Sequence, residues 1–252
     1  MKRESISMEK EWFRNWFNSD QYLEVYQHRD HQDAKKLLDL VFRNVSLKKN
    51  SLILDAACGA GRHLIDLNAK GYNAFGFDLS MNLLKKGKTD AEEKSIRLNL
   101  FRADLRHIAL RQKFDLVLNL FTSFGYFHTD YENFSFAQAA FGFLNEGGIY
   151  VFDYLNEKYL LKNLIPESKR EIEGKTVIER RKIAEGRVVK EIIISNHASE
   201  NRFVESVQLY SKEKIVEEFE KIGFKLTSDF GDYDGTRFDE ENFKRLILFF
   251  MK

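Results

Sequence analysis

The chain has 252 residues, of which 43% are hydrophobic and 31% are charged, and its net charge is +1. This size and composition suit one large globular domain, or one domain with an insertion. The balanced charge gives no sign of a polyanionic partner, the single cysteine excludes an internal disulfide, and no stretch approaches the about 18 apolar residues of a membrane span. The charged start lacks the apolar core of a signal peptide, so we expect a cytoplasmic protein.

The first part of the chain is aromatic and helical in pattern. Tryptophan, phenylalanine and tyrosine residues recur over 12–26, and a second helical pattern covers 34–42. We expect residues 1–45 to form a helical segment that packs partly into the core.

The middle of the chain, 46–156, alternates short apolar runs with helical patterns. The predicted strands are 51–55, 73–78, 98–102, 114–120 and 148–154, and the predicted helices are 61–70, 80–94 and 130–144. Ser80 is a suitable N-cap for the second of these helices. This alternation predicts an α/β fold, with a doubly wound parallel sheet and helices on both faces.

The pattern changes after Asn156. Residues 170–183, 187–197 and 202–210 read as three long strands with short turns, which predicts an antiparallel β insertion over 157–211. A helix at 212–222, ended by Gly223, and strands at 224–230 and 245–251 then complete the core over 212–252.

A glycine-containing turn, DAACGAGRH at 55–63, joins the first predicted strand to the following helix. Gly59 and Gly61 allow the backbone to approach a nucleotide-like ligand. Asp55 would repel a pyrophosphate but suits a cationic ligand. Leu64 stands where the dinucleotide fingerprint needs a small residue, so a dinucleotide-dependent oxidoreductase is disfavoured.

Two further acidic residues follow the next two predicted strands. Asp78 ends the run Phe75-Gly76-Phe77, where it can hold ribose hydroxyls, and Asp104 follows Ala103. Either one could be an ordinary turn residue, because aspartate favours turns. Their ordered spacing after Asp55 favours contact with a ligand.

These segments together resemble the motifs of class I S-adenosylmethionine (SAM)-dependent methyltransferases, in the small-molecule group that includes amino-sugar N-methyltransferases. Ala57 replaces the more frequent glycine of the first motif, as it does in some members of that group. The resemblance covers about 20–156 and, more loosely, the C-terminal helix and hairpin. It implies a Rossmann-like seven-stranded sheet with an antiparallel β insertion after the fifth strand, SAM as the cofactor, and no metal.

The resemblance also implies which residues contact SAM. The acidic residue of the second motif binds the ribose in that family, the next one accepts from the adenine amino group, and the N-terminal segment folds over the cofactor as a lid. The cofactor-binding residues expected on this basis are Tyr22, Tyr26, Arg29, Asp55, Ala57, Gly59, Gly61, Asp78, Leu79, Asp104, Leu105 and Asn119.

Tyr126 and His128 are the candidate catalytic residues. They follow the fourth strand, in the loop that faces the transferred methyl group in this fold. His128 could take a proton from an amine or hydroxyl, and Tyr126 could orient the acceptor, although each could equally be a loop residue without such a role. We expect His63, in the first turn of a helix, to have a structural role.

The expected acceptor is an N or O atom of a small molecule. The chain has one proline, Pro166, which leaves the proline motif of adenine-amino methyltransferases absent after the fourth strand. Cys58 lies in the cofactor turn, away from where cytosine C5 enzymes place their nucleophile. The insertion would form a wall of the acceptor pocket, a homodimer contact, or a cover for the sheet edge.

Two alternative functions stay open. The stretch 94–113 holds six Lys/Arg against one Asp, which would suit an RNA methyltransferase, although a solvated face explains these charges better. A non-catalytic SAM-binding module is the other alternative, since the acceptor side has no diagnostic residue.

Overall fold

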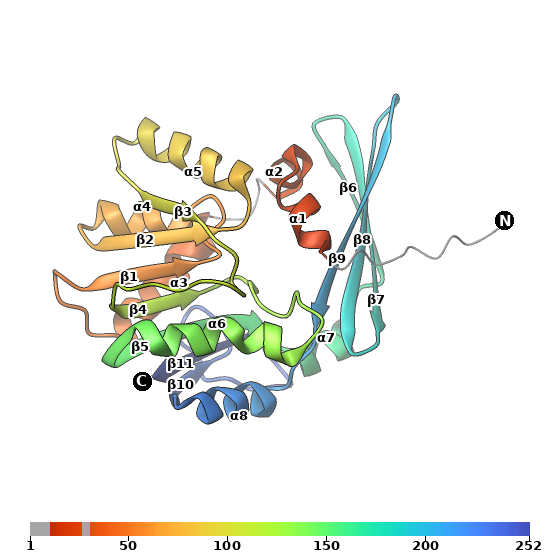
Figure 1. Ribbon diagram of the computed structural model, residues 1–252. Helices are drawn as coiled ribbons and strands as arrows, with labels where there is room; N and C mark the ends of the chain where they lie inside the picture. Colours follow the sequence, from red (N-terminus) through yellow and green to blue (C-terminus); the bar gives the residue numbers. More distant parts are fainter. Residues whose placement is uncertain (1–10, 27–30) are drawn as a thin grey trace.

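The computed structural model describes residues 11–26 and 31–252, and its centre is a seven-stranded sheet. The strand order is β3-β2-β1-β4-β5-β11-β10, and β11 runs in the opposite direction to the other six strands of this sheet (Figure 1). The strands are β1 (Leu52–Ala56), β2 (Asn73–Asp78), β3 (Asn99–Arg102), β4 (Phe114–Asn119), β5 (Leu144–Leu155), β10 (Lys225–Phe230) and β11 (Arg245–Met251). The predicted α/β fold with a seven-stranded sheet is confirmed.

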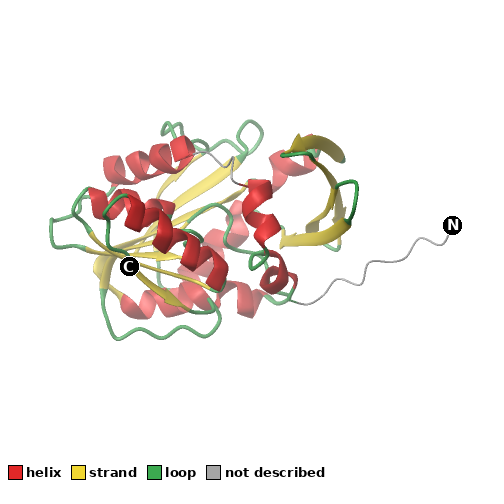
Figure 2. Cartoon of the chain, turned by 90° about the horizontal axis from the view of Figure 1, so that it is seen from above, coloured by secondary structure: helices red, strands yellow, loops and turns green. Residues whose placement is uncertain are grey.

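Helices pack on both faces of this sheet (Figure 2). Neighbouring residues of β1 alternate between the two cores, as the period of a strand requires. Ile53 packs with residues of α3 and α4, whereas Leu54 belongs to the core that contains residues of α6 and α8. The helices are α3 (His31–Asn44), α4 (Arg62–Ala69), α5 (Met81–Glu93), α6 (Asp130–Phe143) and α8 (Lys212–Ile222).

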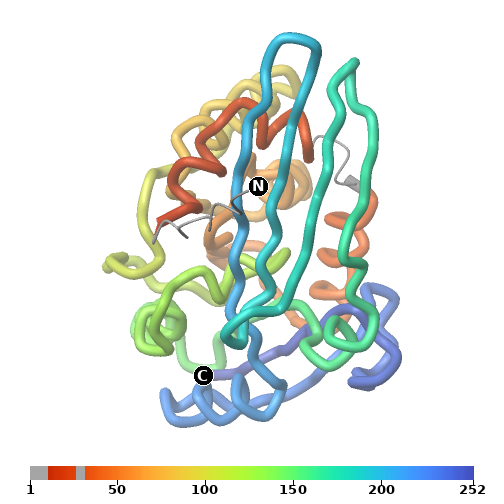
Figure 3. The backbone as a smooth tube through the Cα atoms, turned by 90° about the vertical axis from the view of Figure 1, so that its right-hand side faces the viewer, coloured from red at the N-terminus to blue at the C-terminus, as the bar shows by residue number. Residues whose placement is uncertain are grey.

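The insertion after β5 is a separate antiparallel sheet, whose strands lie side by side toward the viewer in Figure 3. It contains four strands, β6 (Glu167–Ile172), β7 (Lys175–Ala184), β8 (Arg187–Ser195) and β9 (Glu200–Gln208), after the short helix α7 (Glu157–Asn163). The prediction of three strands was wrong, because the expected strand 170–183 is broken by a tight turn. Glu173 and Gly174 both have positive φ, +48° and +77°, as a two-residue hairpin turn requires.

The N-terminal helices α1 (Trp12–Trp16) and α2 (Asp20–Tyr26) lie between the two sheets (Figure 1). The ring of Trp16 packs 4.4 Å from that of Phe203 on β9, and its Nε1 donates to Glu205 at 2.7 Å. In contrast, α3 packs against α4 on the large sheet. Of the helices in the described ranges, none is long and apolar enough to cross a membrane.

Candidate active site

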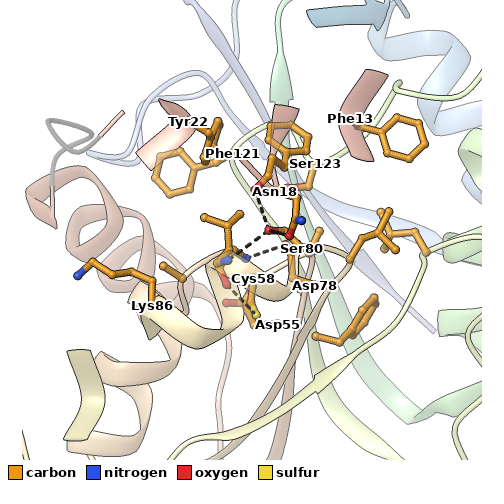
Figure 4. Close-up of a pocket in the computed structure, with 18 of the residues that line it drawn as sticks. Phe13, Asn18, Tyr22, Asp55, Cys58, Asp78, Ser80, Lys86, Phe121 and Ser123 are labelled. Atoms are coloured by element: carbon orange, nitrogen blue, oxygen red, sulfur yellow. Dashed lines mark hydrogen bonds between the residues drawn. The ribbon is translucent and has the colours of Figure 1, made fainter. Parts of the chain in front are cut away.

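A cavity of about 470 Å³ lies where β1, β2, β3 and β4 end, beneath α1 and α2. It is the place where open parallel sheets bind ligands, because the carboxyl ends of the strands and the loops that follow them meet there. Figure 4 shows Asp55, Cys58 and Asp78 on one side of it and Phe13 and Tyr22, from the helices above, on the other. The cofactor-binding and catalytic candidates that line it are Tyr22, Tyr26, Asp55, Ala57, Gly59, Asp78, Leu79, Asp104, Leu105 and Tyr126.

Three of the expected site residues do not line the cavity, and a fourth is not among the described residues. Gly61 faces the side chains of Leu64 and Leu98, and Asn119 is buried behind the cavity, where its Nδ2 donates to the carbonyl oxygen of Ser123 at 3.3 Å. His128 is exposed and does not line the cavity. Arg29 lies outside the described residues.

The glycine turn after β1 is held against the sheet by close packing. Ala57 and Gly59 both have positive φ, +52° and +57°, and the turn is closed by the Cys58 amide, which donates to Phe77 at 2.9 Å. A Cβ on Gly76 would lie 2.9 Å from the sulfur of Cys58, and one on Gly87 would lie 2.5 Å from the carbonyl oxygen of Ala60. Glycines on β2 and α5 therefore leave the room in which the turn sits.

Asp78 is fixed beside this turn by two backbone donors. Its Oδ2 accepts from the Gly59 amide at 2.9 Å and its Oδ1 from the Ser80 amide at 2.8 Å. Burial raises the pKa of Asp78 to about 6, an effect to which the charge of Asp55 adds and which the two amides limit. The carboxyl is thus aimed at the cavity with lone pairs available to hydroxyl donors.

Asp104 lies in a network of ion pairs that the sequence did not reveal. Its oxygens accept from Arg106 at 3.0 and 2.8 Å and from Arg14 at 3.2 Å, and both arginines also pair with Glu11. Partial burial would raise the pKa of Asp104, but these arginines hold it below its usual value. The carboxylate therefore stays ionised, and it joins α1 to the segment after β3.

The loop after β4 supplies the opposite wall. Phe121 and Thr122 have positive φ, +54° and +63°, which is uncommon for such residues and is typical of strained functional sites. Asp153 at the end of β5 holds them, because its Oδ2 accepts from the Phe121 amide at 2.8 Å and its backbone oxygen from the Thr122 amide at 3.0 Å. Arg245 on β11 pairs with the same carboxylate at 2.6 Å.

Tyr126 enters the cavity from an aromatic cluster. Its ring centroid lies 5.2 Å from that of Trp12 and 5.6 Å from that of Phe17, both in or next to α1. The insertion sheet holds the same loop through Arg187, a buried residue that belongs to no recognisable sequence motif. The Arg187 guanidinium donates to the carbonyl oxygens of Gly125, Tyr126 and Phe127.

The cavity fits SAM. Asp55 is 1% exposed, lines the cavity, and its Oδ2 has no hydrogen-bond partner among the described residues. A buried carboxylate oxygen without a partner calls for a cationic or donor group, and SAM carries an ammonium and a sulfonium but no phosphate. Asp78 and the aromatic rings above it suit the ribose and the base of a nucleoside.

The strand order β3-β2-β1-β4-β5-β11-β10, with acidic residues at or just after the ends of β1, β2 and β3, is that of the α/β methyltransferase fold. Residues 53–148 match the model of the methyltransferase domain family.

Curated relatives cover a similar part of the chain. The chain is similar to dTDP-3-amino-3,4,6-trideoxy-alpha-D-glucopyranose N,N-dimethyltransferase of Streptomyces venezuelae. The two are 34% identical over 122 residues, and this alignment covers 48% of each protein. The chain is 28% identical, over 111 residues, to glycine/sarcosine N-methyltransferase of Aphanothece halophytica, which is 43% of this chain and 42% of the relative. The matches thus span about half the length of these relatives or less.

Solved structures share the fold over nearly the whole chain. A SAM-dependent methyltransferase from Clostridium acetobutylicum superposes with a TM-score of 0.77 at 19% identity and covers 91% of this chain and 95% of its own. SAM-bound CalS10, an amino pentose methyltransferase from Micromonospora echinaspora, gives a TM-score of 0.68 at 20% identity and covers 93% and 98%.

Proposed function

We propose that this protein transfers the methyl group of SAM to a nitrogen or oxygen atom of a small molecule. The observation that carries the proposal is the cavity of about 470 Å³ in which the buried Asp55, the glycine turn and Asp78 face aromatic rings of α1 and α2. Similarity to N-methyltransferases of amino sugars and glycine makes amines the first acceptor class to examine.

We assign the residues that line the cavity to two groups, those that bind the cofactor and those that shape the binding site of the methyl acceptor. Asp78 would accept hydrogen bonds from the ribose hydroxyls, and Asp55 would face the positive charge of the amino-acid end. When bound, SAM supplies a methyl group on a sulfonium, which is already a strong electrophile. The protein then has to position the acceptor and exclude water, and α1, α2 and the loop of Tyr126 enclose the cavity for that purpose.

The places of the two candidate catalytic residues favour catalysis by orientation of the acceptor over catalysis by proton transfer. His128 is exposed and does not line the cavity, so we assign it no proton transfer. Tyr126 lines the cavity and is the group on the β4 loop that could orient an acceptor. A cavity enclosed by α1 and α2 also suits a small acceptor better than a nucleic acid.

Calorimetric titration with SAM and with S-adenosylhomocysteine (SAH) tests the cofactor, and a panel of amino sugars and small amines, assayed for SAH production, then tests the activity. We expect micromolar binding of both nucleosides, at least tenfold weaker binding by Asp78→Ala, and turnover of at least one amine. Failure of the folded protein to bind either nucleoside would refute the proposal. Binding without turnover of any acceptor would favour a non-catalytic SAM-binding module.

A further inference from the structure

Asp104 and Asp78 both line the cavity, but the hydrogen bonds of their carboxylates differ. A carboxylate has about four lone-pair sites, shared between its two oxygens. Oδ1 of Asp104 accepts from the backbone amide and from Nε of Arg106, both at 3.0 Å, and Oδ2 accepts from Nη2 of Arg106 at 2.8 Å and from Nη2 of Arg14 at 3.2 Å. These donors fill the sites of Asp104. Each oxygen of Asp78, in contrast, accepts one backbone amide, which leaves lone pairs for a ligand.

The guanidinium of Arg106 is held by more than its pair with Asp104. Its Nη2 also donates to Oε1 of Glu11 at 2.7 Å, and the side chain is 13% exposed. The guanidinium carbon lies 4.7 Å from the ring centre of Phe127, in the loop after β4, and 5.6 Å from that of Phe13 on α1. A guanidinium that moved away from Asp104 would lose these contacts with two other segments of the chain.

These contacts favour a role for Asp104 that differs from the one implied by the resemblance to class I methyltransferases, in which it accepts from the adenine amino group. That amino group is a neutral donor, whereas the guanidinium groups that hold Asp104 are charged. Hydrogen bonds assisted by charge are roughly twice as strong as neutral ones. Exchange of an arginine donor for the amino group of the base is therefore unfavourable.

The arginine partners of Asp104 also join α1 to the core. Arg14 of α1 pairs with Asp104 and with Glu11, the residue before the helix. Phe13 of α1 packs on the guanidinium of Arg106, and both Phe13 and Arg14 line the cavity. The position of α1 over the cavity therefore depends on the ion pairs that Asp104 makes.

We propose that Asp104 is a positioning residue, which holds α1 over the cavity through Arg106 and Arg14 and makes no hydrogen bond to the base of the bound nucleoside. This inference rests on the proposed function, because it assigns the role of one residue of the proposed cofactor site.

The test of the base contact uses two probes with the full chain, SAH and its analogue that lacks only the 6-amino group of the base. Calorimetry gives the affinity of each probe for the native protein and for Asp104→Ala. We expect Asp104→Ala to weaken both probes by at least about fivefold and to change the ratio of the two affinities by less than about twofold. Asp104→Leu, which is closer to aspartate in size, gives the same comparison with a filled site.

The test of the positioning role measures how often α1 leaves the core in the ligand-free protein. Trypsin cleaves after Arg14 when α1 is displaced and locally unfolded, so the cleavage rate follows the population of that state. Arg106→Met keeps an apolar stem but removes the guanidinium, and cleavage after Arg14 should become at least about fivefold faster. Mass spectrometry follows the products. Arg111→Met, at an exposed arginine of the segment after β3, is the control and should leave cleavage and both affinities unchanged.

The outcomes separate this proposal from the proposed function. If Asp104 accepted from the amino group, the native protein would prefer SAH by at least about tenfold and Asp104→Ala would abolish the preference. That result would overturn the proposal and leave the proposed function intact. Unchanged cleavage in Arg106→Met would overturn the positioning role. If the native protein binds neither probe, the proposed function fails together with the statement about the base.

Discussion

Arg187 on β8 donates from Nη2 to the carbonyl oxygen of Gly125, in the loop after β4, at 3.0 Å. The same guanidinium reaches Phe127 at 2.9 Å and Ser206 on β9 at 2.7 Å. Its hydrogen-bond partners in the described part of the chain are uncharged, and burial lowers the pKa of Arg187. The insertion sheet thus holds the cavity loop with a buried cation that is surrounded by carbonyl oxygens.

Replacing this arginine should destabilise the protein. Arg187→Met should lower the free energy of unfolding by about 2–4 kcal/mol, because several buried carbonyl oxygens lose their donor, although removal of the buried charge offsets part of the loss. Urea unfolding followed by circular dichroism measures the change. Arg202→Met on β9, whose side chain is 55% exposed, is the control and should stay within about 0.5 kcal/mol. Equal effects of the two substitutions would show that the hydrogen bonds of Arg187 to the loop after β4 do not contribute to the stability of the fold.

Gly87 should tolerate no side chain. A Cβ there would lie 2.5 Å from the carbonyl oxygen of Ala60, so Gly87→Ala must displace the glycine turn and should weaken SAH binding at least tenfold. Gly142→Ala on α6 is a matched control, since its Cβ would meet no atom within 4 Å. That substitution should leave binding unchanged and raise stability by up to about 1 kcal/mol, the difference in helix propensity. Calorimetry on both variants checks this, and unchanged affinity in Gly87→Ala would contradict the packing.

SAH binding should weaken in acid because of Asp78. Its pKa of about 6 in the ligand-free protein means that the carboxyl takes up a proton as the pH falls through 6. Hydroxyl donors bind the carboxylate form, so the affinity should fall by up to tenfold for each pH unit below 6 and level off above 7. Titrations between pH 5 and 8 measure this, and Asp78→Asn should remove the dependence. A native profile that is flat over this range would separate Asp78 from the ligand.

The same pKa has a consequence for folding. A carboxyl whose pKa is raised in the folded state favours folding in its protonated form, so its contribution is greatest below pH 4 and is lost between pH 4 and 6. Asp78→Asn should therefore reduce any decline in the stability of the ligand-free protein across that interval. Thermal unfolding at pH 4.5 and 7 compares the two proteins, and identical pH dependence would contradict the prediction.

Cys58 should react slowly despite its place at the cavity. Burial raises its pKa well above the usual value, and the charges of Asp55 and Asp78 add to the effect, so the thiol stays protonated at neutral pH. Alkylation by iodoacetamide at pH 8 should be at least about tenfold slower in the native protein than in urea. Mass spectrometry follows the reaction, and equal rates in the two states would show that the thiol is accessible and ionised.

The parallel sheet was predictable because each strand carries its own local signal. The apolar runs that end at Asp55 and Asp78 became β1 and β2, and Ser80 caps α5, where its side chain accepts from the Leu83 amide at 3.2 Å. The sequence pattern does not predict the turn at Glu173, whereas the turn that contains Glu185 falls in the predicted gap between 183 and 187. The alternation of apolar and polar residues continues through both turns, so the glycine is the one local signal that a turn interrupts the strand.

Parts of the candidate site depend on contacts between segments that are far apart in the sequence. Such contacts produce no local sequence pattern from which they could be predicted. Arg187 is 60 residues from Phe127, and Glu205 is 189 residues from Trp16, so neither pair could be read from spacing. The exposure of His128 follows likewise from how the loop after β4 turns toward α6. Acidic residues at strand ends, in contrast, are placed by the sheet itself, which is why Asp55, Asp78 and Asp104 meet at one cavity.

Both tryptophans of the chain, Trp12 and Trp16, lie in α1, against the cavity loop on one side and the insertion sheet on the other. All of the indole emission of this protein therefore originates from one short helix. Each indole is nearly shielded from solvent, at 6% and 1% exposure. Any displacement of that helix that exposed both rings to water would shift their emission to the red, so tryptophan fluorescence would report it directly.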